Sequence, residues 1–352
     1  MFAQKLLNWY SEEGRRLPWR ETQNPYFIWL SEIILQQTRI EQGRAYYEHF
    51  ITKYPTVHHL ADATEEQVLK SWQGLGYYSR ARNLHAAAQH IAYDLNGRFP
   101  DTYDGILSLK GVGRYTAAAI ASFAFRLPYP VIDGNVYRFI SRMYGIYTPI
   151  GTDIAYKEFE HLLLNLIDPQ RPDLFNQALM DFGSIYCKPT GSDCEHCVFR
   201  QECVAFSEGK VNMLPIRPNP VEVKKRYFYY IDIRWDEAKD EYLLVHQREA
   251  GDIWQGLYEL PLYETVEPIS PDMLLSQLLD KANEWTRGEN ARITLGPALK
   301  HQLTHRLINA QFVQVKYNSR PVEIPEKLRP IRLSELKTLP ISRLIDRYLS
   351  KL

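Results

Sequence analysis

The sequence predicts a multidomain protein, with an all-α region of about two hundred residues followed by a smaller α+β domain. Three observations support this prediction. Apolar residues recur at helical spacing in the first region, and four cysteines lie close together at its end. Alternating apolar and polar residues then follow a segment rich in proline and glycine. A length of 352 residues is also typical of two or three domains.

The all-α region shows the helical period in eight segments. The connections contain turn and stop residues, such as Asn24-Pro25 and Asn96-Gly97. No alternating strand pattern of any length interrupts the region. We therefore expect helices at Phe2–Tyr10, Ile28–Phe50, Glu65–Leu75, Ala81–Leu95, Tyr115–Phe125, Val136–Tyr144, Tyr156–Ile167 and Leu174–Phe182.

A linker is predicted at residues 207–224, because one glycine and three prolines break any regular pattern there. A pattern of strands follows, which predicts an α+β domain over residues 225–352. The expected strands are Arg226–Trp235, Glu241–Gln247, Gly256–Leu262, Arg292–Leu295 and Gln311–Tyr317, with helices near Asp272–Glu284 and at the C-terminus.

The composition is that of an ordinary soluble globular protein, with 45% hydrophobic and 24% charged residues. The 42 basic and 42 acidic residues balance, so the net charge gives no support to nucleic-acid binding. No signal peptide and no apolar span of about 18 residues is visible. We therefore expect an intracellular protein without a membrane segment.

The four cysteines, Cys187, Cys194, Cys197 and Cys203, have the spacing C-x6-C-x2-C-x5-C. Four thiolates this close can share one tetrahedral metal ion or one iron–sulfur cluster. The spacing alone leaves zinc and iron–sulfur open, although it lacks the paired C-x2-C knuckles of most zinc modules and so favours a four-iron cluster. We expect the role of this centre to be structural.

The segment Leu109–Ala117 places Gly111 and Gly113 between two predicted helices. Glycines let the backbone approach a partner closely, and the free N–H groups of the following helix favour an anion. A helix-hairpin-helix of this kind can hold a DNA phosphate without net positive charge. A tight turn between helices is the simpler interpretation of the glycines alone.

Two carboxylates stand in contrasting surroundings. Glu32 lies in a strongly apolar helical run, where burial would raise its pKa and suit it to act as a general acid. Asp133 stands at the start of a predicted helix, which is expected to keep the pKa of its carboxyl low. The pair matches the acid and stabiliser of glycosidic-bond cleavage. A hydrogen-bonded structural glutamate and a helix N-cap aspartate are the alternatives.

Further candidate DNA contacts are Gln37 and the segment Gly74–Arg82. The side chain of Gln37 or Tyr77 can fill a gap in a base stack, while Arg80 and Arg82 can hold phosphates. An aromatic turn packed against the core would explain the same residues.

Together these residues resemble the adenine-specific DNA glycosylases of the MutY type, in the helix-hairpin-helix superfamily that also contains endonuclease III. The resemblance covers essentially the whole chain. It rests on several motifs in order, namely Leu17-Pro18-Trp19-Arg20, Ser31-Glu32 through Thr38, Gly74–Arg82, the hairpin, Asp133-Gly134-Asn135-Val136, Asn176 through Gly183, and the cysteine spacing.

The resemblance implies a helical catalytic region over residues 1–206. A six-helix barrel module, about residues 23–130, would lie beside a cluster domain formed by residues 1–22 and 131–206, with DNA in the cleft between them. The resemblance also implies that the cysteines hold one [4Fe-4S] cluster.

The resemblance further assigns roles to single residues. Glu32 would protonate adenine at N7, and Asp133 would stabilise the sugar cation, with Tyr115 and Asn135 beside it. Two of the residues implied to contact DNA enter the base stack around the lesion, namely Gln37 and Tyr77. The others are Arg20, Arg80, Arg82, Gly111 and Gly113.

Tyr115 also separates the candidate relatives. Endonuclease III-type enzymes carry a lysine at this position, whose amine forms a Schiff base and cleaves the strand. Tyrosine cannot do so, and Lys110 lies on the other side of the hairpin. A monofunctional glycosylase is therefore predicted.

The C-terminal domain resembles the Nudix-like domain of the same family. The Nudix catalytic box is missing after Leu262, so a magnesium-dependent pyrophosphatase is not expected. In the family, a Phe-Ser-His segment in a β-hairpin recognises 8-oxoguanine opposite the adenine. This chain has Leu303, Thr304 and His305 there, so the hydroxyl is kept and the aromatic ring is lost.

The expected function is base excision repair, by hydrolysis of the glycosidic bond of adenine mispaired with 8-oxoguanine or guanine in double-stranded DNA. The implied setting is a cytoplasmic, nucleoid-associated monomer that hands its product to an abasic-site endonuclease. Two alternatives remain, a related glycosylase acting on another mispaired base and a non-catalytic lesion-binding protein. Glu32 and Asp133 argue against the second, because binding alone requires neither carboxylate.

Overall fold

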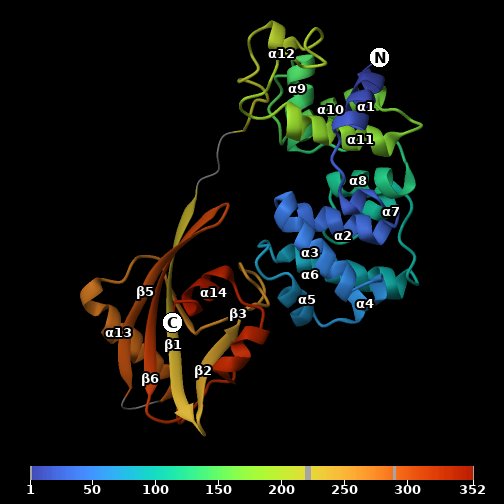
Figure 1. Ribbon diagram of the computed structural model, residues 1–352. Helices are drawn as coiled ribbons and strands as arrows, with labels where there is room; N and C mark the ends of the chain where they lie inside the picture. Colours follow the sequence, from blue (N-terminus) through green and yellow to red (C-terminus); the bar gives the residue numbers. More distant parts are fainter. Residues whose placement is uncertain (1, 219–222, 288–290, 352) are drawn as a thin grey trace. The chain divides into compact units, whose positions relative to one another are not determined.

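The computed structural model describes residues 2–218, 223–287 and 291–351 (Figure 1). These residues form two compact units. The first contains Met1–Asp62 and Ala86–Pro220, and the second contains Ala63–His85 and Val221–Leu352. The structure thus groups Ala63–His85 with the C-terminal sheet, whereas the predicted domains place this segment in the barrel module. None of the described helices is long and apolar enough to span a bilayer.

The described part of the first 207 residues is helical, as predicted, and contains no strand. Its elements are α1 (Phe2–Glu13), η1 (Pro18–Arg20), α2 (Pro25–Leu35), α3 (Ile40–Lys53), α4 (Val57–Asp62), α5 (Glu65–Ser71), α6 (Ser79–Gln89), η2 (His90–Asp94), α7 (Tyr103–Leu107), α8 (Arg114–Phe125), α9 (Gly134–Tyr144), α10 (Asp153–Leu166), α11 (Pro172–Asp181), η3 (Phe182–Tyr186) and α12 (Val204–Ser207).

Two helix predictions need correction. The expected helix Ile28–Phe50 is wrong, because the chain breaks into α2 and α3 at Gln37, whose φ of 54° is left-handed. The short helices α4 and α7 were not predicted, since six and five residues are too few to show a helical period. Residues Tyr103–Phe125 otherwise form the expected helix-hairpin-helix, α7 followed by α8.

The core that supports the cysteine-bearing end of the first unit is rich in aromatic rings. Phe139, Phe159, Phe175 and Phe182 are buried, and three of the four partly exposed cysteines pack against the same cluster, namely Cys187, Cys197 and Cys203. Helix α9 contributes much of this core, because its apolar residues repeat on one face. The cysteine segment is therefore attached to a rigid support.

The second unit contains a mixed sheet. The strand order is β3-β2-β1-β6-β5, with β4 paired to β1 and β7 paired to β2, and β1 runs parallel to β6 while the other pairs are antiparallel. The strands are β1 (Lys224–Glu237), β2 (Asp240–Gln247), β3 (Tyr258–Glu259), β4 (Leu262–Thr265), β5 (Arg292–Gln302), β6 (Arg306–Tyr317) and β7 (Leu328–Arg332).

Helices cover both faces of this sheet (Figure 1). Phe228 and Tyr230 of β1 pack towards α14 (Arg343–Leu349), whereas Tyr229 and Ile231 pack towards α13 (Pro271–Thr286). Because neighbouring residues of a strand point to opposite faces, β1 contributes to both cores. The 3₁₀ segment η4 (Leu333–Thr338) follows β7.

The predicted α+β domain is confirmed in class, but several strand bounds differ. The expected strand Gly256–Leu262 is wrong in extent, since it contains only the two-residue β3 and the start of β4. Strands β5 and β6 are longer than expected and meet at Leu303–His305, which forms the turn of a β-hairpin. The predicted linker, residues 207–224, lies partly outside the described residues.

Candidate active site

The two predicted carboxylates line one cavity of about 190 Å³ in the first unit. Glu32 and Asp133 are separated by a hundred residues in sequence, and α2 and the start of α9 bring them to the same cavity. The other lining residues are Arg15, Leu17, Trp19, Arg20, Ile28, Ser31, Leu35, Thr38, Ile40, Tyr115, Phe123, Asn135, Gln177, Met180 and Ser184.

Glu32 lies in the buried helix α2, with only 7% of its surface exposed. The Tyr115 hydroxyl donates to its Oε2 at 3.0 Å. Burial raises the pKa of Glu32 to about 7, although the hydrogen bond from Tyr115 and the charge of Arg20 act in the opposite direction. The predicted shift is therefore confirmed, and the side chain can hold a proton at neutral pH.

Asp133 caps α9. Its Oδ1 accepts from the backbone N–H groups of Asn135 at 2.8 Å and Val136 at 2.7 Å, and its Oδ2 accepts from the Asn135 amide at 2.7 Å. Both the N-cap interpretation and the cavity position hold for the same residue. The expected low pKa is wrong, because burial raises the pKa of Asp133 against these three hydrogen bonds.

Side-chain hydrogen bonds and close packing hold the segment that leads to Asp133. The buried Asn176 amide donates to the Ser122 hydroxyl at 2.8 Å and the Tyr129 carbonyl at 2.9 Å, and it accepts from the Val131 N–H at 3.0 Å. A Cβ on Gly183 would come within 2.5 Å of the Asn135 carbonyl oxygen. These residues hold the start of α9 in place, which explains part of the motif Asn176–Gly183.

Arg20, expected at a DNA contact, lies in the wall of the cavity. Its guanidinium forms a two-pronged pair with the fully buried Asp181, at 2.8 and 2.9 Å, and also donates to the Arg15 carbonyl. Arg15 pairs with the same carboxylate. The two arginines lower the pKa of Asp181 despite its burial, so one carboxylate holds two cations at the cavity.

Sequence reasoning missed Arg15 and Asp181, and also two arginines of α9. The buried Arg138 donates to the Asn135 side chain at 2.9 Å and to the Cys187 carbonyl at 2.8 Å. One turn later Arg142 contacts the Cys187 sulfur at 3.4 Å and the Lys188 carbonyl at 2.7 Å. Two arginines four residues apart on an otherwise apolar helix are the signal that could have pointed to them.

The four cysteines line one small cavity beside Phe139, Arg142 and Phe199. Burial, with a smaller contribution from the other three thiols, raises the pKa of the Cys197 thiol to about 11. Among the described residues, no three histidine, cysteine or acidic side chains already stand as a metal-binding group. Four soft sulfur donors around one cavity nevertheless match the donor set of a zinc ion or an iron–sulfur cluster.

The turn between α7 and α8 has an open backbone. Gly111 has a left-handed φ of 81°, and no atom lies within 4 Å of a Cβ built on Gly113. No side chain caps α8, and its first turn contains no acidic residue. Its N–H groups are thus available to an anion, as the glycine spacing predicts.

Among the remaining predicted DNA contacts, some side chains are exposed and others contact neighbouring residues of the protein. Gln37 is exposed in the turn after α2, and Tyr77 is 48% exposed with a left-handed φ of 50°. Arg80 stacks over Trp72 and Tyr77, and Arg82 donates to the Gln255 carbonyl at 2.8 Å. Both arginines therefore serve internal contacts in this structure.

The predicted lesion-recognition residues form the turn between β5 and β6. Thr304 and His305 are exposed, while Leu303 packs against the core. The Thr304 hydroxyl lies 2.5 Å from the hydroxyl of Tyr77 within the second unit. Two residues singled out for different reasons thus stand in contact.

Comparison with known proteins identifies the family. Residues 30–169 match the HhH-GPD superfamily of base excision DNA repair proteins, and residues 235–351 match the NUDIX domain. The chain is 32% identical over 314 residues to the adenine DNA glycosylase of Buchnera aphidicola subsp. Baizongia pistaciae, covering 87% of this chain and 83% of that relative. The chain belongs to the adenine DNA glycosylase family.

A further relative and two solved structures are also similar to this chain. The adenine DNA glycosylase of Mus musculus is 39% identical over 230 residues, covering 62% of this chain and 45% of its own length. A thermostable thymine-DNA glycosylase shares 30% identity with a TM-score of 0.55, over 59% of this chain and 95% of its own. An endonuclease III–DNA complex, at 20% identity and a TM-score of 0.52 over 59% of this chain and 94% of its own, shows the same fold.

Proposed function

We propose that this member of the adenine DNA glycosylase family excises adenine from mispairs with 8-oxoguanine or guanine in double-stranded DNA. The observation that carries the proposal is the cavity holding Glu32 and Asp133 in different environments. One carboxylate is buried in an apolar helix, and the other accepts three N–H groups. This is the arrangement that glycosidic-bond cleavage needs.

Glu32 supplies the proton in this mechanism. Its raised pKa lets it carry that proton at neutral pH, and protonation of the flipped adenine at N7 makes the base a better leaving group. Tyr115 holds the carboxyl group in one orientation through its hydroxyl. Arg15 and Arg20, both held by the buried Asp181, bring fixed donors to the wall of the same cavity, where they can meet the edge of a base.

Asp133 stabilises the sugar cation that forms as the base leaves. Three N–H donors to its oxygens favour the ionised form against burial, so a negative charge can face the developing positive charge. Water then completes the hydrolysis and leaves an abasic site. No lysine is among the described residues that line the cavity, which supports a glycosylase without a strand-cleaving step.

The other proposed contacts lie outside the cavity. The N–H groups after Gly111 and Gly113 would bind a backbone phosphate, and Gln37 and Tyr77 would enter the base stack. Thr304, with Leu303 and His305, would read 8-oxoguanine through its hydroxyl. We expect a nucleoid-associated monomer whose abasic product passes to an endonuclease.

A [4Fe-4S] cluster fits the cysteine cavity. Cys187, Cys194, Cys197 and Cys203 would hold it, and it would supply structural cross-linking of this segment rather than chemistry on the base. Arg142, which contacts the Cys187 sulfur, would offset part of the charge of the thiolates.

The function is tested by single-turnover base release from duplexes with adenine opposite 8-oxoguanine, guanine or thymine, developed with and without alkali. We expect release opposite 8-oxoguanine and guanine, with strand breaks only after alkali. Breaks without alkali would show a lyase. A further duplex with thymine opposite guanine tests the other glycosylase, and release of thymine from it, as the thymine-DNA glycosylase relative suggests, would favour that enzyme. Tight binding without release would indicate a lesion-binding protein.

The excision rate should fall as pH rises through about 7, because Glu32 must be protonated and burial raises its pKa to about 7. The rate should also fall on the acid side once Asp133 takes up a proton, above the pH at which an exposed aspartate would do so. A single-turnover pH profile checks both limbs. A profile that stays flat from pH 6 to about 9 would contradict the role of Glu32.

Replacing Cys197 by serine should remove the iron centre. We expect the wild-type protein to be brown with about four iron atoms per chain, and the variant to lose colour and iron because one of four ligands is gone. Iron analysis and visible absorbance measure this without reference to activity. A colourless wild-type protein with one zinc ion would overturn the cluster assignment.

A further inference from the structure

The tip of the proposed lesion-reading turn, Leu303–His305, is held by a small set of contacts, which include the packing of Leu303 on the core and the hydroxyl pair of Thr304 and Tyr77 at 2.5 Å. The Leu303 N–H donates to the Arg306 carbonyl at 2.8 Å and closes the turn, and the His305 carbonyl accepts from the Lys224 N–H at 3.1 Å. Thr304 and His305 are exposed. The position of such a tip depends on what holds the two strands below it.

One loop contacts both of those strands next to the turn. This loop, Arg248–Leu257, joins β2 to β3 and is called here the brace loop. Its Asp252 accepts from the Arg306 guanidinium at 2.8 Å, at the first residue of β6. Its Trp254 packs edge-on against the ring of His301 on β5, with ring centroids 5.6 Å apart. The brace loop therefore contacts both strands of the hairpin, β5 and β6, next to the turn.

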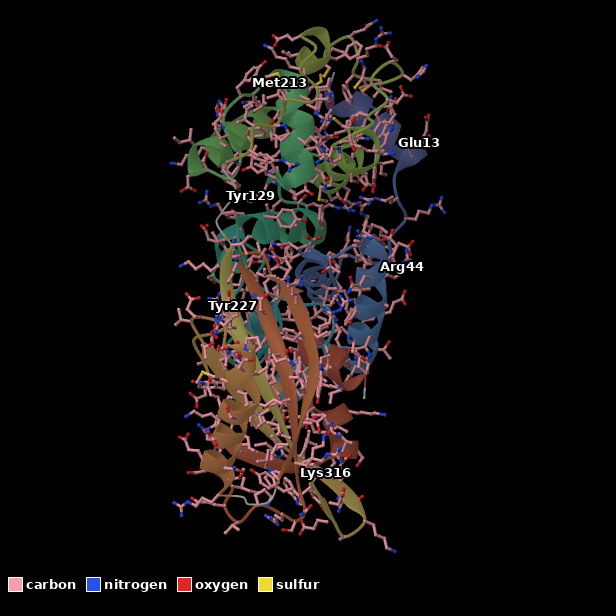
Figure 2. The ribbon with its side chains drawn as sticks, turned by 90° about the vertical axis from the view of Figure 1, so that its left-hand side faces the viewer. Glu13, Arg44, Tyr129, Met213, Tyr227 and Lys316 are labelled. Atoms are coloured by element: carbon pink, nitrogen blue, oxygen red, sulfur yellow. The ribbon has the colours of Figure 1, made fainter. Side chains whose placement is uncertain are left out.

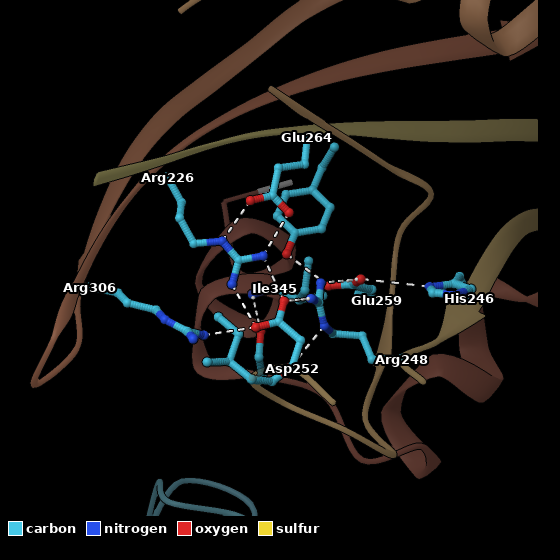
Figure 3. Close-up of polar contacts among 11 residues, drawn as sticks. Arg226, His246, Arg248, Asp252, Glu259, Glu264, Arg306 and Ile345 are labelled. Carbon is cyan, nitrogen blue, oxygen red and sulfur yellow. Dashed lines mark hydrogen bonds and ion pairs between the residues drawn. The ribbon is translucent and has the colours of Figure 1, made fainter. Parts of the chain in front are cut away.

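Asp252 is the centre of a larger network (Figure 3). Arg226 donates to both of its oxygens at 2.7 and 2.6 Å, and Arg248 donates at 2.6 Å. Arg226 also pairs with Glu264, and Arg248 also pairs with Glu259. Three guanidinium groups thus face three carboxylates. Without the charge of Asp252, the same three guanidinium groups would face two carboxylates.

The brace loop is itself closed by backbone hydrogen bonds. The Arg248 N–H donates to the Leu257 carbonyl at 2.9 Å, and the Gly256 N–H donates to the Arg248 carbonyl at 2.8 Å. The Arg248 side chain also donates to the Ile253 carbonyl at 2.9 Å. These hydrogen bonds fix the backbone of the loop and the side chain of Arg248. A loop fixed in this way can hold the residues that it contacts in place.

We propose that Asp252 is a positioning residue that sets discrimination between 8-oxoguanine and guanine by holding the turn Leu303–His305 through Arg306. This inference rests on the proposed function, in which the turn reads the oxidised base. Asp252 acts through Arg306 and does not touch the DNA. Trp254 supports the other strand of the same hairpin.

Charge makes the proposal distinguishable from a general effect on DNA binding. Loss of the Asp252 charge leaves this face more positive, which should strengthen attraction to DNA phosphates whatever the opposite base is. Loss of positioning should weaken only the recognition of 8-oxoguanine. The two effects have opposite signs on the lesion duplex.

The test compares full-length Asp252→Asn with Asp236→Asn and the wild-type protein. Asp236 pairs with Lys316 at 2.9 Å, at the end of β6 opposite to Arg306, and Figure 2 shows Lys316 and Tyr227 at opposite ends of the sheet. Asp236→Asn therefore removes an equal charge from the same unit at a site that has no contact with the turn.

Two readouts are needed. The first is the ratio of single-turnover excision rates for adenine opposite 8-oxoguanine and opposite guanine, at subsaturating enzyme. The second is hydrogen–deuterium exchange of the peptide that spans the turn. Asp252→Asn should lower the ratio about tenfold and speed exchange at the turn, while the rate opposite guanine is kept or rises. Asp236→Asn should match the wild-type protein in both.

Other outcomes overturn the proposal. Unchanged exchange at the turn in Asp252→Asn would show that the residue does not hold it. Faster exchange with an unchanged ratio would show that the turn position does not set discrimination. A wild-type protein with adenine release but no preference for 8-oxoguanine would remove the proposed role of the turn itself, and the inference with it.

A double variant gives a second check that does not depend on one substitution. If Asp252 acts through Arg306, Asp252→Asn combined with Arg306→Gln should lower the ratio no further than Arg306→Gln alone. Additive losses would mean that the two residues act separately, which would overturn the proposed route.

Discussion

Glu32→Gln is expected to lower the single-turnover rate of adenine release by about 10²- to 10⁴-fold while DNA affinity is kept. Glutamine fills the same space and can still accept the hydrogen bond from Tyr115, but it cannot deliver a proton. The measurement is excision from a duplex with adenine opposite 8-oxoguanine, beside the equilibrium affinity for the same duplex.

The matched control is Glu66→Gln. Glu66 accepts the hydroxyl of Tyr258 at 3.0 Å, as Glu32 accepts that of Tyr115, and it does not line the cavity. This control should leave the rate of excision unchanged. Full activity of Glu32→Gln would assign the general acid elsewhere.

Glu32→Gln should also change the free energy of unfolding in a pH-dependent way. Because the folded pKa of Glu32 is raised from 4.5 to about 7, the folded state binds the proton more tightly, and stability falls as pH rises through this range. The cost of the buried charge above pH 7 is about 3 kcal/mol at most. Thermal unfolding should therefore show Glu32→Gln as more stable than the wild-type protein at pH 8, with little difference at about pH 4.

Asp133→Asn is expected to lower the excision rate by about 10²- to 10³-fold, since a fixed charge next to a forming cation contributes on this scale. Asparagine is as good an N-cap as aspartate, and its oxygen can still accept from the N–H groups of Asn135 and Val136. Helix α9 should therefore stay intact, and the loss should be electrostatic. Single-turnover excision and the melting temperature measure the two contributions.

The matched control for this variant is Asp168→Asn. Asp168 also accepts two backbone N–H groups, from Gln170 at 2.9 Å and Arg171 at 3.3 Å, and it lies outside the cavity. The control should leave excision unchanged. A collapse in melting temperature of Asp133→Asn that is absent from Asp168→Asn would instead indicate that the residue is chiefly a helix cap.

Local sequence signals were reliable where the physical cause is itself local. Helical spacing predicted most of the helices, and the glycines at Gly111 and Gly113 predicted a turn with a free helix start. The apolar run around Glu32 predicted its burial and raised pKa. The break between α2 and α3 was missed because a left-handed residue, Gln37, leaves the apolar period almost undisturbed.

Predictions failed where distant elements decide the surroundings of a residue. The pKa of Asp133 was expected to be low from the helix N-terminus alone, but the cavity buries the carboxyl and raises its pKa. The ion pair of Arg20 with Asp181, 161 residues later in the chain, was also not predicted, and it holds the guanidinium in the cavity wall. Neither contact leaves a trace in the neighbouring sequence.

The sequence by itself determined the all-α and α+β classes, the family motifs and the residue types that chemistry requires, because periodicity, turn residues and cysteine spacing act over short distances. Only the tertiary structure decided that Glu32 and Asp133 share a cavity and that Asp252 joins Arg306 beside the turn. Contacts between residues that are distant in sequence depend on how whole helices and strands pack. A carboxylate pairs with whichever cation the fold brings within reach, and that partner can lie anywhere in the chain.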